Sequence, residues 1–155
     1  MKSQKGFSLV ELLVVVIIIA IIAAIAIPNL LASRRAANEA SAIASLRTIH
    51  SAQVTYQSTQ GKGTDFGDFA ALTAGPDTLL DPTFNVTPVH KSGYTFALDQ
   101  TGGASVYCVT AEPDAGAGIR DFAIDYTGVV YFGAAAGTVS CASVDTVAGG
   151  TVLGQ

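Results

Sequence analysis

The feature that most constrains this chain is an apolar run near its N-terminus. Residues 12–27 contain no polar side chain, and Pro28 follows them directly. With residues 7–11 the stretch covers 21 residues, which as an α-helix would measure about 30 Å, the thickness of the hydrocarbon core of a bilayer. Lys2 and Lys5 precede the run, and basic residues favour the cytoplasmic side of a membrane. The pattern therefore predicts a segment that can enter a membrane.

Three interpretations of this segment compete. It could be a secretory signal peptide, with Ala24-Ile25-Ala26 as the cleavage site, although such apolar regions usually have only about 7–15 residues. It could be a simple membrane anchor, which fits its length. Neither explains Glu11, because an acid near the middle of a membrane helix costs about 2.5–3.5 kcal/mol.

The third interpretation gives Glu11 a role. If the chain is cut between Gly6 and Phe7, Glu11 lies one helical turn from a new α-amine. Its carboxylate then meets the positive end of the helix dipole, a favourable interaction of about 0.3–1 kcal/mol. It could also pair with the α-amine of a neighbouring chain, since an acid inside a membrane segment usually faces a partner.

The run Gly6-Phe7-Ser8-Leu9-Val10-Glu11, together with the apolar stretch and Pro28, resembles the processing site of type IV pilins and type II secretion pseudopilins. The resemblance implies that a prepilin peptidase cuts after Gly6 and methylates the new N-terminal Phe7. It also implies that Glu11 recruits the N-terminus of the next subunit during assembly, and that residues 7–28, ending at Pro28, form the assembly segment.

One helix is expected over about residues 7–60. Pro28 removes a backbone donor and should kink the helix near Ala24. Ala20 stands where many pilins have a helix-weakening glycine, so whether the helix melts between Ala20 and Pro28 in a filament stays open. Gly61 and Gly63 should end the helix, because glycine readily takes positive φ values.

The half of the helix after Pro28 is predicted to be amphipathic. Arg35 and Glu39 are spaced to form an ion pair along the helix. His50 is expected to be a packed helix residue rather than a ligand or base. The apolar face is predicted to contain Ile43, Leu46, Ile49, His50, Val54 and Tyr56, with Ala36 and Ala40 near its edge.

After residue 60 the pattern predicts a small antiparallel sheet. Residues 61–92 are rich in Gly and Pro and are expected to be a connecting loop with a helical turn near residues 68–72. Four strands are expected, and the tail from Gly133 is expected to be a loop. The expected fold class is α+β, with the helix covering the sheet. The strands are predicted at residues 94–98, 104–111, 120–125 and 129–132, the last two forming a hairpin.

Cys108 and Cys141 are the two cysteines of the chain, and both follow the apolar run. If this part crosses the membrane it enters an oxidising space, where a disulfide persists. A bond between them would close a loop of about 32 residues and contribute about 3–4 kcal/mol in the chain-entropy model. Such a pair resembles the C-terminal disulfide loop of type IV pilins. Two free thiols are the alternative.

Composition and motifs argue against several function classes. Beyond residue 60 the chain has three basic and ten acidic residues, which disfavours nucleic-acid binding. His50 and His90 are the two histidines and no catalytic motif is present, so neither an enzyme nor a cofactor is expected. The remaining acids are expected to be solvated at the surface rather than to bind Ca²⁺, since they lack EF-hand spacing. These acids are Asp121, Asp125 and Asp145.

The resemblance implies a structural subunit of a type IV pilus-like filament, with other copies of itself as partners. Residues 1–6 are the expected leader peptide, 7–28 the membrane and filament-core half of the helix, 29–60 its amphipathic half, and 61–155 the globular head. Prepilin peptidase, inner-membrane assembly machinery and membrane lipid are the other expected partners, with the head in the periplasm before assembly. A secretion pseudopilin, or a monomeric exported binding domain, is the alternative.

Overall fold

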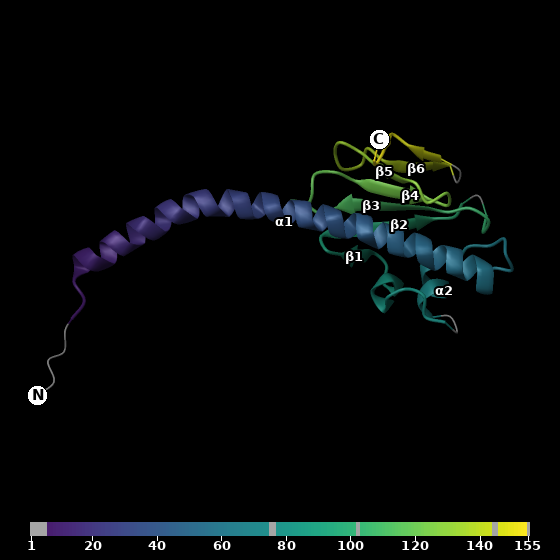
Figure 1. Cartoon of the computed structure of the whole chain (residues 1–155), viewed down its shortest axis with the longest axis horizontal. Helices are drawn as coiled ribbons and strands as arrows, with labels where there is room; N and C mark the ends of the chain where they lie inside the picture. Colours follow the sequence, from purple (N-terminus) through teal and green to yellow (C-terminus); the bar gives the residue numbers. More distant parts are fainter. Residues whose placement is uncertain (1–5, 75–76, 102, 144–145, 155) are drawn as a thin grey trace, which may run out of the picture. The chain divides into compact units, whose positions relative to one another are not determined.

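The computed structural model describes residues 6–74, 77–101, 103–143 and 146–154. The chain divides into two compact units, Met1–Arg34 and Arg35–Gln155, and helix α1 (Leu9–Thr59) contributes to both. Figure 1 labels α1, α2 and β1 to β6. Along the chain the elements run in the order α1, α2, η1 and β1 to β8. The predicted α+β class, a long N-terminal helix with a small antiparallel sheet, is confirmed.

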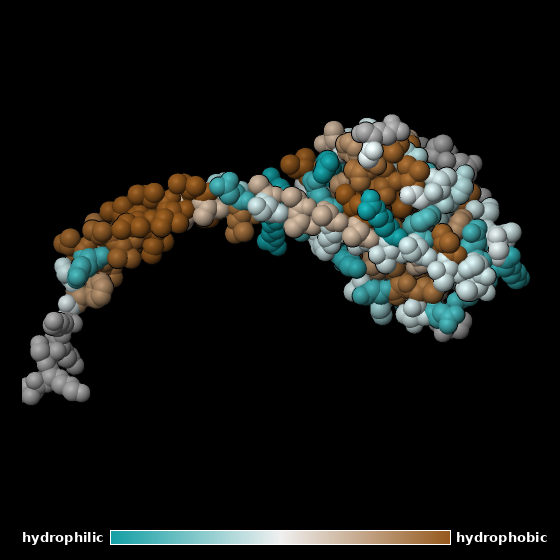
Figure 2. All heavy atoms as spheres, in the orientation of Figure 1, coloured by the Kyte–Doolittle hydropathy of each residue, from teal (hydrophilic) through white to brown (hydrophobic). Residues whose placement is uncertain are grey.

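The first unit is a helix without a core of its own. Its large apolar side chains between Phe7 and Ile27 are 47% to 79% exposed, and Figure 2 shows them as a continuous hydrophobic surface. Length and composition suffice for a membrane span, with a mean hydropathy of 3.3 over 18 residues. A surface of this kind is stable only where lipid or other apolar side chains cover it.

Helix α1 does not end at Pro28, which lies inside it. Proline offers no N–H to the preceding turn, and next to this gap the Asn29 side chain donates from Nδ2 to the carbonyl oxygen of Ile25 at 3.1 Å. The side chain thus adds a hydrogen bond one residue beyond the missing one. The kink expected near Ala24 stays a prediction.

The second unit contains a six-stranded antiparallel sheet, where four strands were expected. Its order is β1-β2-β3-β4-β5-β8, and β6 and β7 form a separate pair. The predicted loop of residues 61–92 also contains η1 and β1, and the predicted loop from Gly133 contains β6 to β8. The strands are β1 (Val89–Lys91), β2 (Tyr94–Asp99), β3 (Cys108–Pro113), β4 (Phe122–Asp125), β5 (Val130–Phe132), β6 (Ser140–Ser143), β7 (Thr146–Ala148) and β8 (Thr151–Val152).

The missed strands are short, and the sequence carries little sign of them. β1, β7 and β8 have only two or three residues each, too few to display an alternating pattern. Their pairing depends on the neighbouring strand, because β1 is aligned along β2 and β8 along β5. The predicted second strand begins at Cys108 rather than Ala104 and continues to Pro113. The helical turn expected near residues 68–72 is present as α2 (Phe69–Ala74), and η1 is Pro82–Asn85.

The core of the second unit lies between α1 and the sheet. Leu46 and Ile49 of α1 are fully buried, and the prediction that Val54 shares their face is wrong, since it is 47% exposed. Ala36 and Ala40, placed at the edge of that face, are also exposed. The buried members of the cluster from α1 are Ala42, Leu46, Ile49 and Ala52, and those from the four central strands are Tyr94, Phe96, Val109, Ala111, Phe122, Ile124 and Val130.

Gln53, and not its neighbour Val54, is the residue of α1 that is buried at this point of the core. It is fully buried, and its amide Nε2 donates to the Gly67 carbonyl at 2.6 Å while Oε1 accepts from the Gly67 N–H at 2.9 Å. Both ends of the amide are therefore satisfied, which removes the cost of burying it. A Cβ on Gly67 would lie 3.2 Å from the Tyr56 ring, so glycine permits this close approach. Beyond the helix Gly63 has φ +80°, as predicted, but the positive φ expected at Gly61 is absent, and Lys62 has φ +54° instead.

Candidate processing and assembly site

Glu11 is held by its own chain at the start of α1. The helix begins at Leu9, and the backbone N–H of Ser8 donates to Glu11 Oε2 at 3.0 Å. Ser8 is thus the N-cap and Glu11 the third helical residue, the spacing of a capping box. The carboxylate also lies near the positive end of the helix dipole. The Ser-x-x-Glu spacing was readable in the sequence, but the role it gives to Ser8 was not predicted.

Gly6 and Phe7 precede the helix in exposed, irregular backbone. Phe7 is 79% exposed, and a Cβ built on Gly6 would meet no atom within 4 Å. Packing within the chain therefore gives no reason for glycine at this position. The peptide bond between the two residues is accessible, and a requirement for glycine there has to come from another molecule that recognises it.

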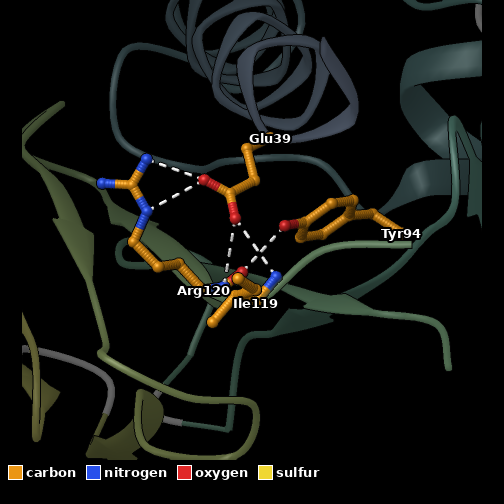
Figure 3. Close-up of polar contacts among 4 residues, drawn as sticks. All are labelled: Glu39, Tyr94, Ile119 and Arg120. Atoms are coloured by element: carbon orange, nitrogen blue, oxygen red, sulfur yellow. Dashed lines mark hydrogen bonds and ion pairs between the residues drawn. The ribbon is translucent and has the colours of Figure 1, made fainter. Parts of the chain in front are cut away.

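Where α1 meets the head, Glu39 makes four hydrogen bonds to one loop (Figure 3). Its Oε2 accepts from Nε and an Nη of Arg120 at 2.9 and 2.7 Å. Its Oε1 accepts from the backbone N–H groups of Ile119 and Arg120 at 3.1 and 3.3 Å. The Tyr94 hydroxyl donates to the Arg120 carbonyl at 2.8 Å. This cluster fastens helix, loop and sheet together.

The expected ion pair between Arg35 and Glu39 is wrong. Glu39 is only 8% exposed and faces Arg120, whereas Nε of Arg35 donates to the Gly116 carbonyl at 3.2 Å. A bidentate arginine on a shielded carboxylate binds more strongly than a solvated neighbour on the same helix. Helical spacing alone could not reveal this partner, which lies 81 residues away in sequence.

The disulfide joins Cys108 of β3 to Cys141 of β6. The segment before β6 is fixed from inside by Asp121, whose Oδ2 accepts from the Val139 N–H at 2.8 Å and whose Oδ1 accepts from the Thr138 hydroxyl at 3.0 Å. A covalent bond and a buried carboxylate thus hold the same segment against the sheet.

The expectation that the acids of this region are solvated is wrong for two of them. Asp121 is 1% and Asp125 is 3% exposed. Buried carboxylates need hydrogen-bond donors, and backbone N–H groups supply them here, from Val139 to Asp121 and from Thr127 to Asp125 at 3.0 Å. Hydropathy treats every Asp as a surface residue and cannot show such donors. Asp145 lies outside the described residues.

Two comparisons show which known proteins this chain resembles. The family model described as the prokaryotic N-terminal methylation motif matches residues 1–27. The type IV wide pilus major component PilA4 of Thermus thermophilus is 36% identical over 117 residues, which cover 75% of this chain and 87% of that protein. The similarity therefore continues through the helix into the head. The chain belongs to the type IV pilin family.

In this pilin the pKa of Glu39 is lowered, although two effects oppose each other. Burial of the carboxylate raises its pKa. The hydrogen bond from Arg120, the two backbone N–H donors and the arginine charge outweigh burial and lower it below its ordinary value of 4.5. Burial also raises the pKa of the Tyr94 hydroxyl, and the nearby Glu39 charge raises it further. The ionised form of Glu39 is the form that the fold stabilises.

The lowered pKa predicts acid sensitivity of the head. A carboxyl whose pKa is lower in the folded than in the unfolded chain stabilises the fold above the unfolded pKa, and this stability is lost as the pH falls through the folded value. We expect the free energy of unfolding to decline below about pH 4.5. Glu39→Gln should lower it by about 1–3 kcal/mol at pH 7 and flatten the decline. Denaturant unfolding at several pH values measures both.

The matched control for this prediction is Glu112→Gln, which neutralises an exposed carboxylate on β3. It should change the free energy of unfolding by less than about 0.5 kcal/mol. Equal effects of the two substitutions, or an unchanged acid profile in Glu39→Gln, would contradict the role of the Glu39–Arg120 cluster.

His50 is a packed helix residue of this pilin, as predicted. It is half-buried, and its Nδ1 lies 2.6 Å from the hydroxyl of the fully buried Tyr107. Burial lowers the pKa of the imidazole, although the Asp125 charge partly opposes this. Within the described ranges, no group of three or more His, Cys, Asp or Glu side chains is placed to hold a metal ion. The hydrogen-bonded pair of His50 and Tyr107 is a polar part of the core.

Proposed function

We propose that this pilin is the structural subunit of a type IV pilus filament and that it polymerises through residues 7–28. The observation that carries the proposal is the apolar half of α1. Its side chains are exposed on all sides and include one carboxylate, Glu11, at the N-terminal turn. In a filament these helices cover one another, so that contacts between subunits replace contacts with lipid. The relative from Thermus thermophilus, named as a major pilus component, supports the same role here.

The proposed life of the chain has two stages. It is made with residues 1–6 as a leader and inserted in the bacterial inner membrane, with residues 7–28 in lipid and the head in the periplasm. A prepilin peptidase then cuts between Gly6 and Phe7 and methylates Phe7, and inner-membrane machinery assembles the filament. The methylation-motif match and the exposure of Gly6 and Phe7 support the cleavage and methylation step. Residues 29–60 then carry the head, residues 61–155, on the filament.

Within the family, a pilus subunit is favoured over a secretion pseudopilin. The disulfide between Cys108 and Cys141 resembles the C-terminal loop of type IV pilins, and the relative is named as the major component of a wide pilus. We assign no catalytic role to the chain. Its proposed partners are other copies of itself. The head carries more acidic than basic residues, which disfavours binding of nucleic acid.

The test of this proposal is the N-terminus of the mature protein. Mass analysis of purified filaments should find the chain beginning at N-methylated Phe7. A chain that begins at Ile27, after the Ala24-Ile25-Ala26 site, would instead show an ordinary signal peptide and refute the proposal.

Gly6→Ala should leave an uncut precursor in the membrane. A Cβ at this position meets no atom within 4 Å, so the substitution does not disturb the fold, and any effect reports on recognition by the peptidase. We expect immunoblots of membrane fractions to show the longer chain with no filaments at the cell surface. Normal cleavage of the variant would contradict the assignment of Gly6.

A further inference from the structure

An open apolar groove lies in the head between α2, η1 and the two strands at one edge of the sheet, β1 and β2. Its volume is about 420 Å³. Its floor includes Phe84, whose ring centroid lies 5.7 Å from those of both Phe69 and Phe96. Val89 and Leu98 also line it. Because these aromatic rings are packed on one another, the floor is preformed.

The rim of this groove carries negative charge. Asp68 lines it and is exposed. Its Oδ1 accepts from the Ala71 N–H at 2.7 Å, and it makes no ion pair with any residue that the structure describes. Asp81, the exposed N-cap of η1, adds a second charge beside the groove. The Lys91 amine lies over the Phe84 ring, 4.9 Å from its centroid. Its single positive charge offsets only one of the two negative charges.

A matching surface lies on α1 beyond the apolar run. Leu30 is 68% exposed, and Arg34 follows it by four residues and is also exposed, so the two share one helix face. Two other pairs on α1 have this spacing. In one, Arg35 is bonded to the Gly116 carbonyl, and in the other Ile43 packs against the core of its own head. Leu30 and Arg34 are exposed and do not share these contacts of the other two pairs with the head of their own chain.

We propose that the groove receives the Leu30–Arg34 face of a second copy of the chain in the filament. Leu30 would lie on the apolar floor and Arg34 beside Asp68. The inference rests on the proposed polymerisation, because subunits that assemble head to tail bring one surface of a chain against a different surface of the next. An apolar knob with a cation one turn away complements an apolar floor with an acidic rim.

The direct test is crosslinking in assembled filaments of the full chain. A photo-reactive phenylalanine derivative at position 30 should form covalent dimers whose crosslinked peptides fall in residues 68–70 or 84–98. A probe at Thr87, which lines the groove, should capture the region around residue 30 of another copy. The same probe at Val54, also exposed on α1, is the control and should not crosslink to the groove.

Exchanging charges between the helix and the groove tests the proposed contact of Arg34 with the acidic rim. Arg34→Glu should lower filament yield by about tenfold or more, and so should Ala70→Lys, which adds a cation to the groove from an exposed position of α2. Combining the two should restore most of the yield. Arg47→Glu, at another exposed arginine of α1, should keep filament yield within about twofold of wild type and should not be improved by Ala70→Lys.

The outcomes separate this inference from the proposed function. If wild-type chains form filaments but position 30 crosslinks outside the groove, or if the charge exchange gives no recovery, the docking contact is wrong while the pilus function stands. Capture of a different protein at position 87 would also overturn the contact with a second copy. If wild-type chains form no filaments, the proposed function and the contact fail together.

Discussion

Glu11→Ala is expected to yield a pilin that inserts and is cut normally but forms at least about tenfold fewer filaments. In the isolated chain the carboxylate is occupied by the Ser8 N–H. In the filament we expect it to face the α-amine of another subunit inside an apolar bundle. Removing one partner of a buried ion pair costs several kcal/mol, and about 1.4 kcal/mol is a tenfold change in an equilibrium constant. Electron microscopy and sheared-filament yield measure the effect.

Glu11→Gln distinguishes charge from capping. Glutamine can serve at the third position of a capping box as glutamate does, but it cannot pair as an ion with an α-amine. We therefore expect Glu11→Gln to assemble as poorly as Glu11→Ala. Normal filaments with glutamine and none with alanine would mean that Glu11 acts through the helix cap and not through a partner subunit.

Replacing both Cys108 and Cys141 with serine should lower the free energy of unfolding by about 3–4 kcal/mol. This is the entropy of closing a loop over a sequence separation of 33 residues. It is large beside the roughly 5–15 kcal/mol of total stability expected for a domain. Chemical denaturation of the full chain in detergent, followed by tyrosine fluorescence, gives the difference.

The wild-type pilin treated with a reductant should approach the same stability as the double variant, and thiol labelling without reductant should leave both cysteines unmodified. Ser140→Ala, on the exposed neighbour of Cys141 in β6, is the matched control and should change stability by less than about 0.5 kcal/mol. Full labelling of native material, or equal stability with and without reductant, would contradict a stabilising disulfide.

The features that could be predicted from the sequence are those with a local pattern. The apolar run, the helix through residue 59, and the hairpin of β4 and β5 depend on neighbouring residues, and the structure contains all of them. The position of Gly63 after the helix is of the same kind. Each is determined by hydropathy or backbone preference within a few residues, which a single sequence displays.

The features that could not be predicted depend on partners far along the chain. Glu39 can be buried because Arg120 and the backbone of Ile119 supply four hydrogen-bond donors to its carboxylate. Asp121 can be buried because Thr138 and Val139 supply donors to its carboxylate. A single sequence gives no measure of such pairings. The same reason explains the missed edge strands, which are strands only because a neighbour aligns them. At the candidate assembly site, Glu11 could be noticed from the sequence because residues 12–27, which follow it along the chain, are all apolar.

The polar contacts at residues 35–41 determine where mechanical load enters the head. Because α1 continues through Pro28, tension applied to residues 7–28, the proposed filament core, passes along the covalent backbone and the helical hydrogen bonds, one of which is missing at Pro28. Side chains then transfer it to the sheet. The first to do so are Arg35, Asn38, Glu39 and Ser41, bonded to the loop of residues 116–120 and to Ser92. They stand on successive turns and share the force in parallel. A pulled pilus would strain this row of contacts before it reached the apolar core behind them.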